Sequence, residues 1–260
     1  MTWTEALLLA ISAAAAGVIN AVAGGGTLIT FPALLLARTP AVVANATSTL
    51  ALVIGTGGGV FGYRRQLASV RPWLARFVPV SIVGGLIGAI LLTVTGETLF
   101  SHLVPFLLLF ATVVFVAQGA FRRFAGFETG AGGALHPHSR EIWVAVLYQF
   151  LVAIYGGYFG AGIGILMLAS LGFIGLTDIH EMNALKTVLG SLINLVAAGY
   201  FIFAGLIAWP KAGVMTIGAV IGYFLGAHYA QKISQKRVRQ IITAIGFVIS
   251  AVLFYRQFLR

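Results

Sequence analysis

A single lysine lies inside an otherwise apolar stretch of this sequence. Lys186 belongs to the segment NALKT (183–187), near the start of the apolar run 182–203. An unpaired cation at such a position costs several kcal/mol, so it is a functional candidate, here for contact with an anionic substrate. The alternatives are that its amine reaches the membrane interface or that it pairs with Glu181 or Asp178.

The segment NATST (45–49) repeats the polar pattern of NALKT earlier in the chain. Residues four apart share one face of a helix, so Asn45 and Thr49 can present amide and hydroxyl groups to one ligand. Asn183 and Thr187 can do the same. Helix capping is the alternative for each asparagine, but capping does not account for the threonine one turn later.

Glycine clusters precede both polar segments. GGG (24–26) and GAGIG (160–164) interrupt apolar sequence and are followed by the short apolar pieces 27–37 and 164–174. At 1.5 Å per residue, each piece reaches only about half of a ~30 Å hydrocarbon layer. A helix that begins at such a break exposes N–H groups with partial positive charge, which suits an anion. Close packing of small residues between helices is the alternative.

We expect these groups to form one substrate site where two halves of the chain meet. The predicted substrate-binding residues are Gly24, Gly25, Gly26, Asn45, Thr47, Ser48, Thr49, Gly162, Gly164, Asn183, Lys186 and Thr187. Asp178, His180 and Glu181 precede Lys186 and are candidates for proton coupling. A solvated helix start is the alternative for these three residues.

Motifs for a catalytic nucleophile, a nucleotide or a zinc protease do not occur, so we expect neither enzyme activity nor a cofactor. His136 and His138 form an HPH segment without a third ligand nearby, so no metal site is expected. The chain has no cysteine, which excludes disulfides and thiolate metal sites.

The composition is that of an integral membrane protein. Hydrophobic residues make up 60% of the chain and charged residues 8%, and the mean hydropathy is +1.01. The net charge is +10, but the basic residues gather in loops and at segment ends, which indicates membrane topology rather than nucleic-acid binding. Expected partners are a small anionic substrate and membrane lipid, and a homo-oligomer is left open.

Eight apolar segments are long enough to cross a bilayer. The predicted full spans are 5–23, 45–63, 72–93, 103–121, 141–160, 182–203, 210–229 and 239–258. We expect the first span to be retained rather than cleaved as a signal peptide, because no Lys or Arg occurs before Arg38.

An internal repeat becomes visible when the sequence is aligned with itself at an offset of 138 residues. We interpret the matches as a duplication, with accidental register between two apolar blocks as the alternative. The aligned identities include Gly24 with Gly162, Gly26 with Gly164, Asn45 with Asn183, Thr49 with Thr187, Pro72 with Pro210, Gly84 with Gly222 and Gly88 with Gly226.

The charge of corresponding loops reverses between the two halves. Segment 64–71 is strongly basic and its counterpart 202–209 is uncharged, whereas 93–101 has no Lys or Arg and its counterpart 231–239 is rich in both. Because cytoplasmic loops are enriched in Lys and Arg, corresponding loops should lie on opposite sides of the membrane. This requires inverted repeats with an odd number of segments each.

The predicted fold is therefore all-α and polytopic. It has two inverted repeats, each with four full transmembrane helices and one short half-helix or re-entrant segment. The predicted boundaries are 1–121 for the first repeat, 122–140 for a cytoplasmic connecting loop and 141–260 for the second repeat. Both termini are then outside the cytoplasm. Inverted repeats with helices broken at corresponding positions predict a secondary transporter whose substrate binds near the midplane.

Three segments carry a family resemblance: GVINAVAGGGTLITFPALL and ANATSTLALVIGTGGGVFGYRR in the first half, and YGGYFGAGIGILML in the second. On these residues the chain resembles the TauE/SafE sulfite-exporter family, also called the toluene sulfonate uptake permease group, over nearly its whole length. The second half departs where Ser170 stands opposite Pro32. The resemblance implies a multi-pass protein of the cell inner membrane that transports sulfite, a sulfonate or a related organosulfur anion, often as an exporter.

Two other functions are compatible with the same sequence. One is a structural or assembly protein of the membrane that uses its small-residue faces only for helix packing. The other is a passive anion channel, which would conduct without saturation or coupling.

Overall fold

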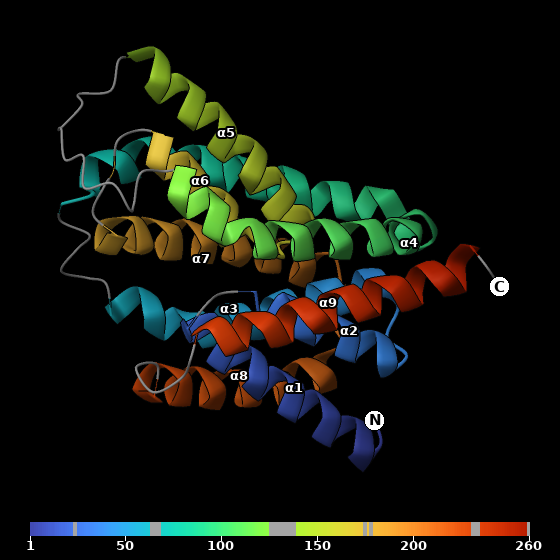
Figure 1. Ribbon diagram of the computed structural model, residues 1–260. Coiled ribbons are helices and arrows are strands. Elements are labelled where there is room, and N and C mark those ends of the chain that lie inside the picture. Colours follow the sequence, from blue (N-terminus) through green and yellow to red (C-terminus); the bar gives the residue numbers. More distant parts are fainter. Residues whose placement is uncertain are drawn as a thin grey trace.

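The computed structural model describes residues 1–22, 25–62, 69–124, 139–173, 176, 179–229 and 235–258, and every regular element in these ranges is an α-helix (Figure 1). This confirms the all-α class. The helices are α1 (Trp3–Val22), α2 (Thr27–Leu36), α3 (Ala41–Gly62), α4 (Arg71–Phe124), α5 (Ser139–Tyr158), α6 (Ile163–Phe173), α7 (Ile179–Phe203), α8 (Trp209–Tyr229) and α9 (Gln235–Phe258).

Local sequence explains where α1 begins. The Thr2 N–H donates to the Glu5 carboxylate at 2.9 Å, and the Glu5 N–H donates to the Thr2 hydroxyl at 3.2 Å. This reciprocal capping box satisfies two N–H groups that the first turn leaves without helical acceptors. The apolar residues that follow form a helix because only a helix satisfies the backbone of a single segment inside lipid.

Four described stretches are long and apolar enough to cross a membrane. They are Trp3–Ala21, Arg71–Ala117, Glu181–Phe203 and Gln240–Phe258. The stretch in α4 covers two of the predicted spans. Ala41–Gly57 and Ile142–Tyr158 are apolar but shorter. A total of eight full spans thus stays a prediction.

Helix α4 contains the connection that the sequence predicts at 93–101. Two helices meet within this segment at Gly96, whose backbone is non-helical, with φ 71° and ψ 170°. The predicted separation of two segments is thus present, but the connection is a kink at one glycine instead of a loop over 93–101, because the residues on both sides of Gly96 keep helical geometry. Gly96 divides α4 into a first part, 71–95, and a second part, 97–124.

The two short helices lie where the glycine clusters predict them. Helix α1 ends at Val22 and α2 begins at Thr27, while α5 ends at Tyr158 and α6 begins at Ile163. The second break ends earlier than predicted, because Gly164 already belongs to the first turn of α6. Of the predicted connection 122–140, residues 125–138 are outside the described ranges, and its ends belong to α4 and α5.

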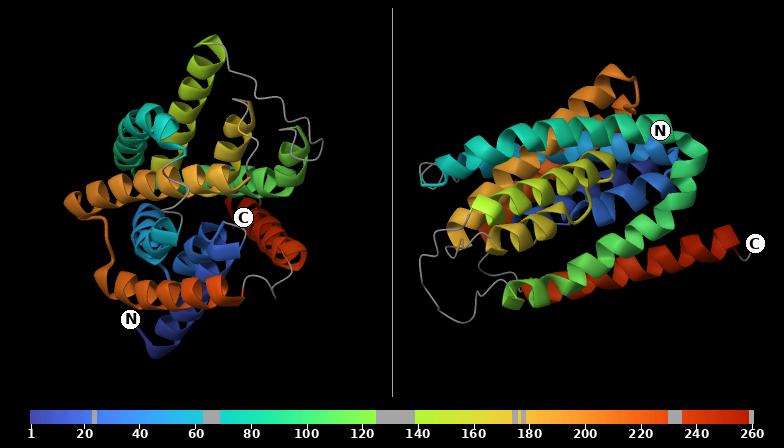
Figure 2. Two further views of the ribbon diagram at one scale, coloured as in Figure 1. Left: turned by 90° about the vertical axis from the view of Figure 1, so that its left-hand side faces the viewer. Right: turned by 90° about the horizontal axis from the view of Figure 1, so that it is seen from above.

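The helices form two groups. Group 1 consists of α1, α2, α3 and α8, and group 2 consists of the first part of α4 with α5, α6 and α7. Figure 2 (left) shows α1 and α8 on one outer side and the start of α4 with α5 on the other, with α3 and α7 between them. Helices α3 and α7 pack against each other, and α9 packs on α4 and α2.

Glycines permit the closest helix contacts within each group. A Cβ on Gly84 would lie 2.8 Å from the Phe150 carbonyl oxygen of α5, and one on Gly226 would lie 2.7 Å from Cα of Val18 in α1. A Cβ on Gly88 or Gly222 would overlap backbone atoms of α5 or α1. These four glycines therefore serve close helix packing.

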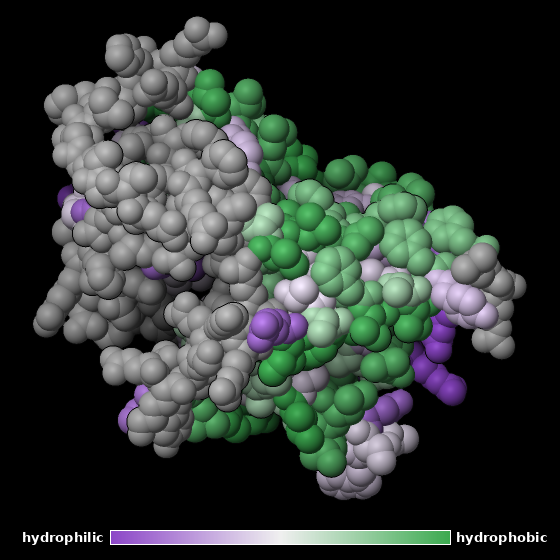
Figure 3. Space-filling view, in the orientation of Figure 1, coloured by the Kyte–Doolittle hydropathy of each residue, from purple (hydrophilic) through white to green (hydrophobic). Residues whose placement is uncertain are grey.

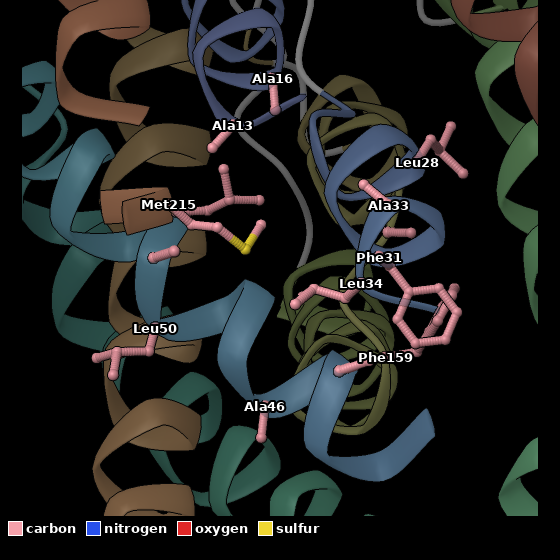
Figure 4. Packing of buried hydrophobic residues seen from close by; sticks show 14 of the residues in the cluster. Ala13, Ala16, Leu28, Phe31, Ala33, Leu34, Ala46, Leu50, Phe159 and Met215 are labelled. Atoms are coloured by element: carbon pink, nitrogen blue, oxygen red, sulfur yellow. The ribbon is translucent and has the colours of Figure 1, made fainter. Parts of the chain in front are cut away.

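Apolar side chains fill the space between the helices and also cover the outside. Phe31 of α2 packs edge-on against Phe159 with ring centroids 5.3 Å apart, next to Leu34 (Figure 4). On the described part of the face in Figure 3, most of the surface is apolar. Exposed residues such as Val94 (77%) and Phe224 (71%) belong to this outer surface. A surface of this kind suits contact with lipid.

The chain termini lie at one end of the bundle, which we call the terminal end. The kink of α4 at Gly96 lies at the same end (Figure 2, right). The helix ends that flank the predicted cytoplasmic loops, such as the start of α5 and the end of α8, lie at the opposite end (Figure 1).

Candidate functional site

At the first glycine break, a side chain of the protein itself accepts a backbone N–H. The Gly26 N–H donates to Oδ1 of Asn20 at 2.8 Å, so Asn20 caps the start of α2 from the last turn of α1. Ala23 and Gly24 lie outside the described residues. Gly25 has φ +92°, and a Cβ there would lie 2.9 Å from Cε2 of Phe115. Glycine is therefore required at this turn for both conformation and space.

The hydroxyl groups near this break bond to each other. The Oγ atoms of Thr30 and Ser48 lie 2.6 Å apart, and both side chains are fully buried. Thr30 also donates to the Gly26 carbonyl oxygen at 3.3 Å. Ser48, which the sequence predicts as a substrate ligand, thus ties α3 to α2.

The remaining polar residues of α3 are also engaged within the protein. Nδ2 of Asn45 donates to the Tyr158 carbonyl oxygen at 3.0 Å, and the Thr49 hydroxyl donates to the Asn45 carbonyl oxygen at 2.9 Å. The Thr47 hydroxyl accepts the N–H of Ala208 at 3.1 Å. Asn45 is 1% exposed, and its Oδ1 has no hydrogen-bond partner among the described residues.

The second glycine break is built differently. Gly160 (φ +79°) and Gly162 (φ +81°) adopt left-handed conformations that favour glycine, and the Tyr155 hydroxyl donates to the Ala161 carbonyl oxygen at 2.8 Å. The N–H groups of Ala161, Gly162 and Gly164 donate to no acceptor in the described parts of the chain. The start of α6 therefore presents several free donors, whereas at the start of α2 the Gly26 N–H is capped by Asn20.

Lys186 lies directly beside this open helix start. Its aliphatic chain crosses the first turn of α6, with Cδ 3.2 Å and Cγ 3.5 Å from the point that a Cβ on Gly164 would occupy. The side chain is half-buried. Gly164 therefore provides the space along which Lys186 runs from α7 to α6.

Two other predicted ligands lie on the same helix as Lys186. Asn183 and Thr187 are half-buried, and neither side chain makes a hydrogen bond with another described residue. Of the predicted coupling groups, Glu181 lies in the first turn of α7 and is half-buried. Asp178 and the side chain of His180 lie outside what the structure describes.

Sequence analysis missed several polar residues at the two breaks. Asn20 accepts the Gly26 N–H, and Thr30 donates to the Gly26 carbonyl oxygen. Oδ1 of Asn194 lies 3.5 Å from the position of a Cβ on Gly160. Asn20 and Asn194 are polar residues within apolar runs, and this signal could have identified both of them.

Two charged residues hold the turn between α2 and α3 at the terminal end. Nζ of Lys211 donates to the Ala37 carbonyl oxygen at 2.8 Å and to the Thr39 hydroxyl at 2.9 Å. The Glu97 carboxylate accepts the N–H groups of Ala41 and Val42, the latter at 2.9 Å. A cation at the end of one helix and an anion at the start of the next both match the helix dipoles.

Comparison with known proteins identifies the family. The model of the family described as sulfite exporter TauE/SafE matches residues 9–253. This chain belongs to the TauE/SafE family. No solved structure matches it significantly.

Relatives of this TauE/SafE chain carry transporter names. It is 27% identical over 248 residues to "Probable membrane transporter protein ORF9" of Sinorhizobium sp., covering 93% of this chain and 89% of that protein. It is 28% identical over 246 residues to a "Probable membrane transporter protein" of Haemophilus influenzae, covering 93% of this chain and 91% of that protein. The Escherichia coli K12 protein "Probable membrane transporter protein YfcA" is 26% identical over 251 residues, covering 92% and 86%.

Family membership and the apolar helices together make this TauE/SafE chain a multi-pass membrane protein. Within it, the start of α6 has free N–H donors beside Lys186, and Asn183 and Thr187 lie within one turn of this lysine on α7. All of these groups can donate hydrogen bonds. An arrangement of this kind can bind a small anion without any covalent chemistry.

Proposed function

We propose that this TauE/SafE protein is a secondary membrane transporter for a small sulfur-containing anion, such as sulfite or a sulfonate, and that it works as an exporter. The observation that carries the proposal is the position of Lys186 across the first turn of α6. The family model and the names of the relatives agree with transport across a membrane.

The charges explain why an anion is the expected ligand. The start of a helix carries a partial positive charge, and Lys186 adds a full positive charge beside it. An anion bound at the start of α6 is attracted by both positive charges, and this attraction is stronger in a partly desolvated site.

Asn183 and Thr187 give the site its hydrogen-bond donors. Both project from α7 near Lys186 and make no hydrogen bond with another described residue. The oxygen atoms of a sulfite or sulfonate group can accept hydrogen bonds from an amide, a hydroxyl and an ammonium group at once. We propose that the substrate is held mainly by the second half of the chain.

The arrangement of helices supports two inverted repeats around this site. Helix α1 packs on α8 in the same way that its counterpart α5 packs on α4, and α3 packs on α8 as its counterpart α7 packs on α4. The pairs α1–α2 and α5–α6 also correspond. We propose repeats at 1–121 and 141–260, with the basic loops on the cytoplasmic side of the inner membrane.

Transport by purified protein in liposomes tests the proposal. We expect saturable sulfite flux that Lys186→Met weakens by roughly tenfold or more in affinity, because a charge-assisted contact is lost. Arg76→Met removes an exposed cation of equal charge at the start of α4 and should leave affinity unchanged. Flux is measured with sulfite, sulfate, sulfonates and organic acids, with and without a pH gradient.

Three results would contradict the proposal in different ways. Unchanged affinity in a correctly folded Lys186→Met variant removes the lysine from the site. Flux that rises linearly with sulfite concentration indicates a passive channel. Absence of flux for every anion, in protein that remains monodisperse, indicates a structural or assembly role.

A further inference from the structure

A hydrogen bond between the two helix groups has a counterpart that is not formed. Nδ2 of Asn45, on α3 of group 1, donates to the carbonyl oxygen of Tyr158, the last residue of α5 in group 2. The residues at the matching positions of the other half are Asn183 on α7 and Asn20 in the last turn of α1. In the described structure, Asn183 makes no hydrogen bond.

We infer that Asn45 and Asn183 act as a two-position latch, in which each asparagine joins the helix groups in one of two conformations. In the conformation seen here, Asn45 holds the Tyr158 carbonyl. In the other, Asn45 releases it and Asn183 holds the carbonyl of Asn20. The inference rests on the inverted repeats of the proposed transport function, and it assigns Asn45 to the conformational change rather than to the substrate.

The position of each asparagine decides which end of the protein it closes. Asn45 lies in the second turn of α3, close to the terminal end where this helix begins. Asn183 lies in the second turn of α7, close to the opposite end. A rocking motion that brings the groups together at one end separates them at the other, so the two bonds form alternately.

Burial of corresponding residues supports this assignment. Asn45 is 1% exposed and Ser48 is fully buried, whereas their counterparts Asn183 and Lys186 are half-buried. The terminal side of the contact between the groups is therefore packed, and the substrate-binding residues of the second half remain accessible. The conformation seen here is the one closed at the terminal end.

Other contacts also favour the conformation that is closed at the terminal end. Glu97 and Lys211 hold the turn between α2 and α3, but the matching residues in the other half are Gln235 and Trp73. Neither of these carries a charge. The second half therefore lacks charged groups for these two contacts at its own end, and we expect the two conformations to differ in free energy.

Spin-label distances across each end test the latch, and the chain has no cysteine that would interfere. One pair of introduced cysteines, Val94→Cys with Trp209→Cys, spans the terminal end. The other pair, Trp143→Cys with Phe224→Cys, spans the opposite end. All four side chains are exposed. Distances are measured by double electron–electron resonance on the full chain in lipid vesicles without sulfite.

The two asparagine variants should shift the distances in opposite directions. Asn45→Ala should lengthen the distance at the terminal end and shorten it at the opposite end, and Asn183→Ala should do the reverse. The ratio of the two distance populations should change about two- to tenfold, as expected for the loss of one net hydrogen bond. Gln149→Ala is the control, because its bond to Ser81 lies within group 2.

Shifts in the same direction in both variants, or in neither, overturn the latch, as does an equal shift in the Gln149 control. If Asn45→Ala does not fold, Asn183→Ala decides alone, since Asn183 has no partner among the described residues and its loss does not break a bond seen here. Because the distances are recorded without substrate, opposite shifts without sulfite flux retain the latch and reject the proposed substrate.

Discussion

At the scale of single residues, the central pair is Lys186 and Gly164. The lysine runs along the glycine with its Cδ 3.2 Å from the position of a missing Cβ. A side chain at residue 164 would compete with the lysine for this space. The small residue therefore has a function that differs from helix packing, because the atoms it admits belong to a flexible cation.

This contact leads to a prediction about Gly164→Ala. The added methyl group displaces Lys186 by a few tenths of an ångström, while α6 gains a better helix former. We expect the half-saturation concentration for sulfite to rise several-fold while thermal stability is unchanged or higher. Gly190→Ala is the matched control, since its Cβ would make only an ordinary contact with Ile163. Equal affinity in both variants would show that the position of the lysine does not matter.

At the scale of helices, the two glycine breaks have similar sequences, but the helices that follow them begin in different ways. The start of α2 is capped by Asn20, and the residue that corresponds to Asn20 in the other half is Tyr158. Tyrosine cannot cap a neighbouring turn with a short side-chain acceptor. The start of α6 therefore keeps its donors free for a ligand, and α2 is fixed to α1.

The cap provides a stability prediction. Asn20→Ala leaves the Gly26 N–H without its acceptor and should lower the free energy of unfolding by about 1 kcal/mol. Asn20→Asp keeps an acceptor oxygen and should lower the free energy of unfolding by a smaller amount. Thermal unfolding in detergent measures both variants. A fully stable Asn20→Ala protein would mean that this N–H finds another acceptor.

At the scale of the whole molecule, the contacts between α1 and α8 and between α4 and α5 hold each group together. Both interfaces depend on glycines whose missing side chains admit the backbone of the neighbouring helix. In lipid, such packing replaces the hydrophobic effect as the force that associates helices. This packing would hold each group together during the rocking motion that we propose.

A substitution at one of these glycines should disrupt the bundle. In Gly222→Val, the new side chain would overlap the backbone of α1 at Ala14, so we expect little folded protein. Gly199→Ala is the control, because a Cβ there would meet nothing within 4 Å. Yield of monodisperse protein measures the difference. Normal yield of Gly222→Val would require the two helices to separate without loss of stability.

The sequence by itself determined the all-helical membrane class, both glycine breaks and the place of Lys186, because these depend on local hydropathy and backbone freedom. It placed a loop over 93–101, where the structure has two helices that meet at a kink at Gly96. It also predicted equal roles for Asn45 and Asn183. Only the tertiary structure decided which donors are already used, because the partner of Asn45 is Tyr158, 113 residues away. Hydrogen-bond partners that distant depend on how helices pack, which local pattern does not encode.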